Sequence, residues 1–306
     1  MRDVTDLDLR KLRVLRELSE RGTVSAAARA LHLTPQAVSQ QISALGRELG
    51  VPLTEPSGRR LRLTGAARIV LRHADAVFTQ VEQMRAELAA HGSGERGEVA
   101  VAGFSTTLSA LILPAVARLR ESRPLLRTSL AEVDPPESFS MLHRGETDVV
   151  ISADTAGTAG EDPRFHRVAL CEDPFDIALP EGHRLLGSPR LLLADLAEET
   201  WIFATTGLCH DIGVAACTAA GFTPQASHAI GDWDATLAAV RFGLGVALVP
   251  RMAKPAPRPE VTIRAFSERA PSRTVFAAVR EGSQTSPEIA AVLDALRTVA
   301  RAAVAL

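Results

Sequence analysis

The stretch from Gly22 to Ile42 constrains the fold of this chain more than any other feature. It predicts two short helices around a tight turn. Three alanines at positions 26–28 give the first helix a face that another helix can approach closely. Leu31 and Leu33 are expected to anchor the turn. The result would be a small, rigid helical pair rather than a long isolated helix.

The second helix of this pair has clear boundary signals. Thr34 is placed to cap it, and Pro35 follows at the first helical position, where a missing N–H costs no hydrogen bond. Its apolar residues recur at steps of four, three and four, which predicts one buried stripe made of Val38, Ile42, Leu45 and Leu49.

The opposite face of the same helix carries short amides and a hydroxyl, at Gln36, Ser39 and Gln40. Such a face suits the major groove of DNA, where donor and acceptor patterns distinguish the base pairs. The alternative is an ordinary helical hairpin with a solvated polar face, because helix-turn-helix patterns also arise by chance. The residues that follow weigh against that alternative.

Those residues predict a short basic hairpin. Leu61 and Leu63 alternate with arginines, as in a half-buried strand, and Ser57 and Gly58 supply a turn before it. We expect a β-wing whose tip presents Arg59 and Arg60 to phosphates or to a narrow minor groove; a solvated basic strand is the alternative. Residues 1–64 carry a net charge of +4, although the whole chain carries −2. A basic head on an acidic body is typical of a nucleic-acid-binding module joined to another domain.

A long helical pattern then runs from Thr64 to about Ala90. One side of it forms an apolar seam with a single charged interruption, made of Ala67, Leu71, Ala74, Phe78, Val81, Arg85 and Leu88. A lone helix cannot bury such a seam, so it should pair with a second copy or lie on another domain. Pairing is favoured, because symmetric dimers read symmetric DNA half-sites. The segment from His91 to Gly94 is expected to end the helix as a flexible joint.

The body after Gly97 alternates strands with helices, which predicts an α/β domain with largely parallel sheets. Strands are expected at 99–104, 127–133, 148–152, 176–179, 201–204 and 246–250. Helices are expected at 107–121 with a kink at Pro114, and at 136–144, 210–220, 233–242 and 287–303. Ligands bind beyond the carboxyl ends of such strands.

Hydroxyl-rich turns mark those strand ends. Ser105, Thr106 and Thr107 follow the first strand and open a helix, so they can hold a carboxylate or phosphate there, or one of them can simply cap the helix. Ser152 ends another strand, and Thr205 and Thr206 follow the strand at 201–204 on what would be a second lobe. These six residues are our candidate effector site.

By these residues the chain resembles the LysR-type transcriptional regulators. The resemblance is carried by Ala26-Ala-Ala-Arg-Ala-Leu-His-Leu-Thr-Pro-Gln-Ala-Val-Ser-Gln-Gln-Ile42, Leu49-Gly-Val-Pro-Leu53 and Gly58-Arg-Arg60, and downstream by Gly145-Glu-Thr-Asp148, Leu179-Pro-Glu-Gly-His183 and Gly243-Leu-Gly-Val-Ala-Leu-Val-Pro250. It implies a base-reading role for Thr34, Pro35, Gln36, Ser39 and Gln40, and a wing role for Arg59 and Arg60.

The resemblance also implies the domain organisation. A winged helix-turn-helix at 1–64 is expected to be followed by a dimerising linker helix at 65–92. A two-lobed effector domain of periplasmic-binding-protein type would fill 97–306, with lobe I at about 97–166 and 268–306 and lobe II at about 167–267. The expected protein is a sequence-specific regulator that binds double-stranded promoter DNA as a homodimer or homotetramer and responds to a small effector, for example a carboxylate.

Other functions are weaker alternatives. A carrier or enzyme with a binding-protein fold would leave the basic head and the apolar seam without a role, and no phosphate loop, zinc spacing or nucleophile elbow is present. We therefore expect no catalytic residue, cofactor or metal. Three cysteines and the absence of a membrane-spanning apolar run favour a reducing cytoplasm. Thiol redox sensing by Cys209 and Cys217 stays open as an alternative, although Cys217 fits a core position.

Overall fold

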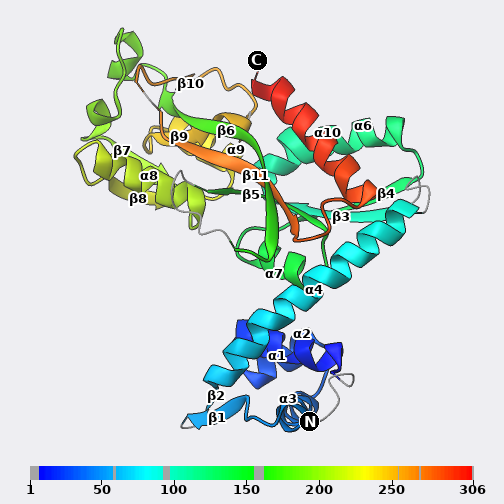
Figure 1. Ribbon diagram of the computed structural model, residues 1–306. Helices are drawn as coiled ribbons and strands as arrows, with labels where there is room; N and C mark the ends of the chain where they lie inside the picture. Colours follow the sequence, from blue (N-terminus) through cyan, green and yellow to red (C-terminus); the bar gives the residue numbers. More distant parts are fainter. Residues whose placement is uncertain are drawn as a thin grey trace. The chain divides into compact units, whose positions relative to one another are not determined.

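The computed structural model describes residues 7–57, 60–91, 97–154, 162–253, 255–268 and 270–304. The chain divides into two compact units, Met1–Val81 and Glu82–Leu306 (Figure 1). The helix α4 (Gly65–His91) contributes to both of them.

The first unit is a helical head with a two-stranded sheet. It contains α1 (Leu9–Arg21), α2 (Val24–Ala30), α3 (Pro35–Leu49), β1 (Thr54–Ser57) and β2 (Arg60–Leu63), of which the two strands pair antiparallel. Side-chain caps start α3 and α4: the Thr34 hydroxyl accepts from the Ala37 N–H, and the Thr64 hydroxyl accepts from the Ala67 N–H, each at 3.1 Å. Gly50 ends α3 in the left-handed conformation. The start and the end of α3 therefore agree with the boundary signals in the sequence.

The core of the head corrects the predicted stripes in three places. Val38, Ile42 and Leu45 are buried, but Leu49 is 38% exposed because α3 ends there. Leu31 packs against the core, whereas Leu33 is 36% exposed and does not anchor the turn. In the wing, Leu63 packs on the core and Leu61 is exposed.

The apolar seam of α4 is divided rather than continuous. Ala67 and Ala74 are buried in the core of the head, and Leu71 and Phe78 pack against that core. The Arg16 guanidinium of α1 also lies over the Phe78 ring, 4.2 Å from its centroid. The expectation that these four seam residues face a second copy is therefore wrong, because the chain's own head covers them.

A seven-stranded mixed sheet organises the second unit. Its order is β10-β6-β11-β5-β3-β4, and β9 also pairs with β6. The strands are β3 (Gly97–Gly103), β4 (Leu126–Glu132), β5 (Val149–Asp154), β6 (Phe165–Pro180), β9 (Ala247–Pro250), β10 (Val261–Arg264) and β11 (Ser272–Arg280). In this sheet β3 pairs parallel with β4 and β5, and every pairing of β6 and β11 is antiparallel. The prediction of largely parallel sheets was wrong for this reason.

Strand β6 runs through both lobes of this unit. Up to Pro174 it pairs with β11, and from Phe175 onward it pairs with β9 and β10. The pairing partner therefore changes at 174/175, whereas the sequence placed the passage between lobes at 166/167. The sequence also predicted only residues 176–179 of this strand and missed β8 (Gln225–Ala229), β10 and β11.

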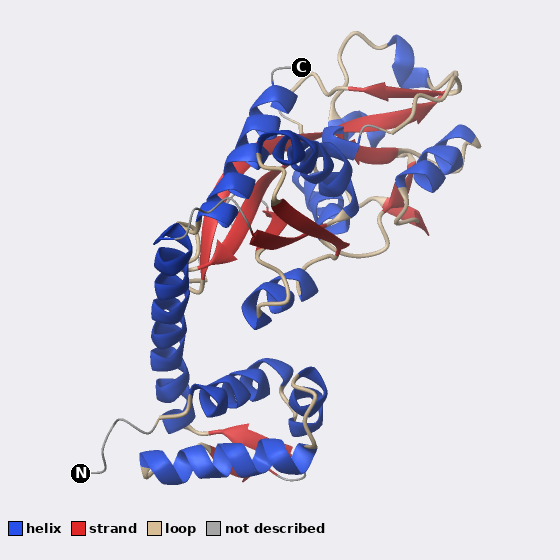
Figure 2. Cartoon of the chain, turned by 90° about the vertical axis from the view of Figure 1, so that its right-hand side faces the viewer, coloured by secondary structure: helices blue, strands red, loops and turns tan. Residues whose placement is uncertain are grey.

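Helices cover both faces of the sheet, as Figure 2 shows. On lobe I, α6 (Leu113–Ser122) and α10 (Pro287–Val304) pack on one face, and α7 (Glu137–Arg144) packs on the other. Lobe II adds β7 (Thr200–Phe203), which is parallel to β8, and the helices α8 (Leu208–Ala219) and α9 (Trp233–Arg241). Its core includes Trp201 stacked on Phe203, with 5.5 Å between the ring centroids. None of the described helices meets the length and apolarity that a membrane crossing requires.

The helix after β3 is interrupted where the sequence predicted a kink. It starts as α5 (Ser105–Thr107), continues as a π-helical turn at Leu108–Ile112 and resumes as α6 just before Pro114. Proline lacks the N–H of a regular α-helical hydrogen bond, and a π-turn is one way a helix accommodates that loss.

Candidate functional site

The polar face of α3 is open to solvent. Thr34, Pro35, Gln36, Ser39 and Gln40 are all exposed, while Val38 on the opposite face is fully buried. Thr34 is also the helix cap, so its hydroxyl is already engaged by the Ala37 N–H. The arrangement leaves two amides and one hydroxyl able to approach base edges from one side of a rigid helix.

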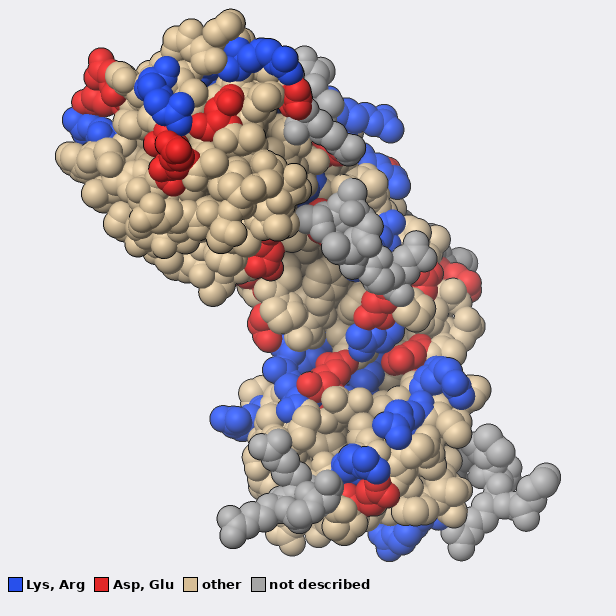
Figure 3. All heavy atoms as spheres, turned by 90° about the vertical axis from the view of Figure 1, so that its left-hand side faces the viewer, with Lys and Arg blue, Asp and Glu red and all other residues tan. Residues whose placement is uncertain are grey.

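The wing is built from the antiparallel pair β1 and β2. Gly58 and Arg59 lie outside the described residues, and Arg60 opens β2. Arg62 is held by Glu55 on the paired strand, through Nε and Nη2 contacts of 2.9 and 2.7 Å to one carboxylate oxygen. The charge of Arg62 is thus balanced within the hairpin. Basic side chains are visible at the lower end of the head on the face drawn in Figure 3.

The six candidate effector residues have different environments. Thr106, Thr107 and Ser152 are buried, whereas Ser105, Thr205 and Thr206 are exposed. The Thr107 hydroxyl donates to the Phe104 carbonyl at 2.8 Å, which is a local structural bond. Thr106 differs from these, because its hydroxyl bonds to a side chain that also contacts the other lobe.

That side chain is Arg273, the second residue of β11, which is 2% exposed. Its Nη2 donates to the Thr106 hydroxyl at 2.9 Å, and its Nη1 donates to the Cys209 sulfur at 3.2 Å. Thr106 belongs to α5 in lobe I, and Cys209 belongs to α8 in lobe II. One buried guanidinium therefore bonds to both lobes.

The charge of Arg273 is balanced by Asp173 on β6. Nε and Nη2 of Arg273 lie 2.9 and 2.8 Å from one Asp173 oxygen, and the Met252 N–H donates to the other oxygen at 2.9 Å. Burial raises the pKa of the Asp173 carboxyl, and Arg273 and the Met252 N–H oppose that rise. The pair is enclosed by Phe104 and Phe175, whose ring centroids lie 4.8 and 5.6 Å from the guanidinium carbon.

Sequence reasoning missed Arg273 and Asp173. A single arginine at the start of the apolar run that continues to Val279 was the available signal, since a charge on a buried strand needs a partner. That signal could not be used, because the sequence did not predict a strand at this position.

The cysteines are thiols in an environment that disfavours the thiolate. Burial raises the pKa of Cys171 to about 11 and that of Cys217 to about 12. Burial also raises the pKa of Cys209; Arg273 opposes this rise, and Asp173 and Asp134 reinforce it. Cys209 and Cys217 lie on the same helix eight residues apart, which corresponds to about 12 Å of helical rise. A disulfide needs Cα atoms within about 7 Å, so α8 would have to unwind to form one.

Two other features of the second unit bear on ligand chemistry. Arg167 lies 3.1 Å from Asp154 at the end of β5, so the negative charge at that strand end is balanced. Among the described residues, no group of His, Cys, Asp and Glu side chains is arranged to hold a metal ion.

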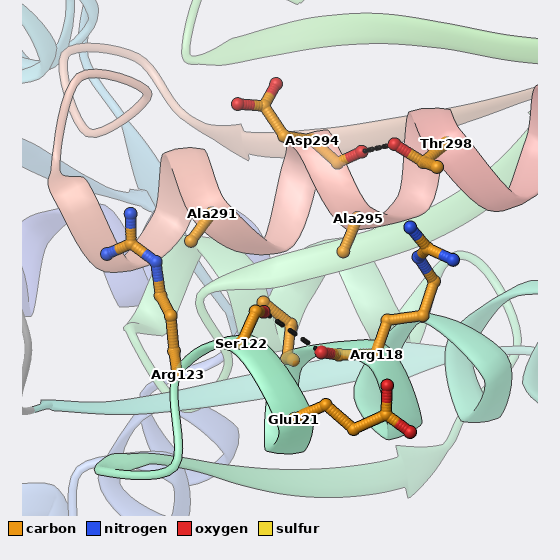
Figure 4. A pocket seen from close by; sticks show the side chains of 9 residues that line it. Arg118, Glu121, Ser122, Arg123, Ala291, Asp294, Ala295 and Thr298 are labelled. Atoms are coloured by element: carbon orange, nitrogen blue, oxygen red, sulfur yellow. Dashed lines mark hydrogen bonds between the residues drawn. The ribbon is translucent and has the colours of Figure 1, made fainter.

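A groove of about 460 Å³ between α6 and α10 is a separate concavity (Figure 4). Arg118 and Arg123 extend along it, and Ala291 and Ala295 form its wall on α10. Arginines and carboxylates both line it, and none of the candidate effector residues does. Its mixed charge does not select one class of ligand.

Comparison with known proteins gives matches over nearly the whole chain. Residues 9–68 match the family model described as "Bacterial regulatory helix-turn-helix protein, lysR family", and residues 92–301 match "LysR substrate binding domain". The chain is similar to the "Probable hydrogen peroxide-inducible genes activator" of Mycobacterium avium, with 30% identity over 89% of this chain and 88% of the relative. It is also similar to the HTH-type transcriptional regulator CatR of Pseudomonas putida, with 30% identity over 80% and 83% of the two chains. Among solved structures, a full-length OxyR variant from Pseudomonas aeruginosa covers 96% of this chain and 97% of its own, with a TM-score of 0.66 and 23% identity.

Proposed function

Because this chain belongs to the LysR family of DNA-binding transcriptional regulators, we propose that a small effector bound between its two lobes at Arg273 controls its action on promoter DNA. The protein is a regulator and not an enzyme. One observation carries the proposal: Arg273 bonds to Thr106 of lobe I and to Cys209 of lobe II. A ligand that competes for this guanidinium changes how the lobes are held together, and so has a different affinity for the two arrangements.

The chemistry of the site favours a carboxylate. Arg273 is a fork of donors suited to a planar anion, the Thr106 hydroxyl is bonded to it, and we assign Ser105, the residue before Thr106, to the same site. We also assign to this site the exposed Thr205 and Thr206 of lobe II, and Ser152 near the end of β5. Because Asp173 already balances one positive charge, a monocarboxylate fits this site better than a dianion.

A thermal-shift screen of the full chain against small carboxylates and amino acids tests this proposal. An effector at a hundred times its dissociation constant is expected to stabilise the protein by about 2.7 kcal/mol. Thr106→Ala should weaken that shift, and Thr298→Ala, on the separate α6–α10 groove, is the control that should leave it unchanged. A carboxylate shift of equal size in the wild type and in Thr106→Ala would reject this site.

For DNA recognition we propose that the exposed face of α3 reads base edges and that the wing contacts phosphates. Arg59→Ala is expected to weaken binding to all sequences and to lower the salt dependence, since each phosphate contact contributes to the slope. Ser39→Ala is expected to change discrimination at one base position. Gel shifts on DNA upstream of the chain's own gene at several salt concentrations measure both effects. The same loss across every DNA sequence for both variants would contradict base reading by Ser39.

We also propose that α4 mediates self-association through its exposed apolar side chains, most of which lie outside the predicted seam. Among the described side chains of α4, four large apolar ones are exposed, namely Ile69, Val77, Met84 and Leu88, and of these only Leu88 belongs to the predicted seam. The last of them is 65% exposed, and burying these side chains against a second copy is the simplest way to remove them from water. Sedimentation of Leu88→Glu against Arg68→Glu, a second new carboxylate on the same helix, tests it; only the first should dissociate the oligomer. Assembly of two dimers on one promoter, and action in the cytoplasm, stay part of the proposal.

Thiol sensing is a second candidate function, favoured by the 3.2 Å contact between Arg273 and Cys209 and by the name of the Mycobacterium avium relative. Two observations weigh against it: the raised pKa of Cys209 and the helical separation of Cys209 from Cys217. Thiol titration and gel shifts with and without hydrogen peroxide decide. Peroxide-dependent DNA binding that Cys209→Ser abolishes would establish thiol sensing, and unchanged binding would reject it.

A further inference from the structure

Arg280, the last residue of β11, is the hub of a second polar network in the effector domain. Its Nη1 donates to the backbone carbonyls of Thr147 and Leu142 at 2.7 and 3.2 Å, and its Nη2 donates to Asp148 at 2.8 Å. Asp148 in turn accepts from the Ala100 N–H at 3.0 Å. These bonds tie the end of β11 to α7, to the start of β5 and to β3.

The remaining nitrogen of Arg280 contacts the linker helix. Nε lies 3.3 Å from the Glu82 carboxylate, and both side chains are only 18% exposed. Ala86, one turn further along α4, is 3% exposed, so this side of the helix faces protein and not water. Both residues lie in the same compact unit as Arg280. The ion pair therefore fastens the C-terminal part of α4 to the effector domain.

The same strand carries Arg273 at its other end. Arg273 and Arg280 are seven positions apart, which corresponds to about 23 Å along a strand. Between them β11 pairs with β5 without interruption from Thr274 to Val279 and with β6 through one register shift at Val275/Phe276, where β6 holds the extra residue, and its residues from Val275 to Val279 are buried. Close-packed protein interiors are hard to compress and transmit strain. We therefore expect a displacement at one end of β11 to reach its other end.

We propose that Arg280 is a positioning residue that couples the inter-lobe site to the linker helix, with β11 as the rigid connection between them. A change in the bonds of Arg273 shifts β11, and Arg280 passes that shift to Glu82 and thereby to α4. This inference rests on the proposed effector site, because it assigns to that site the route by which it reaches the DNA-binding end.

A double-mutant cycle on the full chain without any effector tests the coupling. Thr106→Val removes a bond to Arg273, Glu82→Gln removes the charge that Arg280 holds, and the two sites share no contact. The measured quantity is the dissociation constant for the promoter fragment. Distant, independent substitutions combine additively. We expect each single variant to change the constant at least threefold and the double variant to match the stronger single within twofold.

Arg85→Gln is the matched control. Arg85 is exposed and also contacts Glu82, at 3.3 Å, on the surface of α4. Combined with Thr106→Val, it should act additively. Hydrogen exchange adds a readout that a purely structural role for Arg280 would not move: amides at 82–91 should lose protection in Thr106→Val, although that substitution is remote from them.

The coupling is overturned if the effects of Glu82→Gln and Thr106→Val on the dissociation constant are additive in free energy. It is also overturned if Glu82→Gln binds the promoter fragment with wild-type affinity. The cycle substitutes Glu82 and not Arg280, because Arg280 keeps three other acceptors when the Glu82 charge is removed and its network stays in place. A missing carboxylate response would reject the effector site and leave this cycle measurable. An additive cycle beside a positive carboxylate response would reject only the coupling.

Discussion

The buried pair of Arg273 and Asp173 makes the sharpest energetic prediction. Replacing Arg273 by Met keeps much of the side-chain volume but removes the main counter-charge of the Asp173 carboxylate, which is 2% exposed and keeps its bond from the Met252 N–H. Breaking a buried ion pair on one side costs about 3–5 kcal/mol, because the remaining charge stays out of water. For a domain of this size each kcal/mol lowers the melting temperature by roughly 2–4 °C, so the expected loss is roughly 6–20 °C.

Tryptophan fluorescence is a suitable assay, because the chain's two tryptophans, Trp201 and Trp233, both lie in the effector domain. Urea unfolding at pH 7 should give the full deficit for Arg273→Met. The double variant with Asp173→Asn should recover at least half of it, since Asn carries no charge and still accepts from the Met252 N–H. A single variant that loses less than about 1 kcal/mol, or a double variant worse than the single, would refute the argument.

The pH dependence of the same variant has a defined sign. Burial raises the folded pKa of Asp173 above its unfolded value, and Arg273 opposes that rise in the wild type. Loss of Arg273 therefore raises the folded pKa further. A raised carboxyl pKa favours the folded state below the unfolded pKa and penalises it above the folded pKa. The deficit of Arg273→Met relative to wild type should accordingly shrink in acid; a deficit that grows in acid would contradict this assignment.

Three further predictions concern separate parts of the chain. Thr34→Ala should destabilise the head by about 1 kcal/mol through loss of the α3 cap, measured by circular dichroism melting; no loss would mean that the cap is dispensable. Gly245→Ala should cost at least about 3 kcal/mol, because a new Cβ would lie 2.5 Å from the Thr200 carbonyl oxygen. Gly243→Ala meets open space and should cost only about 1–2 kcal/mol for its positive φ. Equal urea midpoints for the two variants would contradict the packing argument. Cys209 in the native protein should be alkylated by iodoacetamide much more slowly at pH 8 than a free thiol, with a rate that rises with pH, since its pKa is raised; fast labelling at pH 7 would refute the burial.

The helical head could be predicted from local chemistry because its boundaries depend on adjacent residues. Thr34, Pro35 and Gly50 define α3 by capping, by a locked φ and by tolerance of the left-handed conformation, none of which needs a distant partner. The polar face of α3 follows from the same 3.6-residue period that sets its buried stripe. Family membership was equally accessible, since the head motifs are contiguous.

Long-range contacts decided what local patterns left open. The helix α4 carries apolar residues on two sides, and only the folded chain shows that Ala67, Leu71, Ala74 and Phe78 belong to the head's own core. The pairing direction of β6 and β11 depends on partners about a hundred residues apart along the chain, and side-chain alternation does not encode that direction.

The candidate effector site also contains residues with local signals in the sequence and residues that depend on long-range contacts. Thr106 could be proposed from the sequence, because a hydroxyl after a strand and before a helix is a local motif. Arg273 could not, because its meaning depends on Asp173 in a neighbouring strand and on Cys209 in the other lobe. Helix capping and hydrophobic periodicity act between residues a few positions apart, so the sequence alone determines them. The buried Arg273 guanidinium, which bonds to both lobes, acquires its partners only once distant strands have packed side by side.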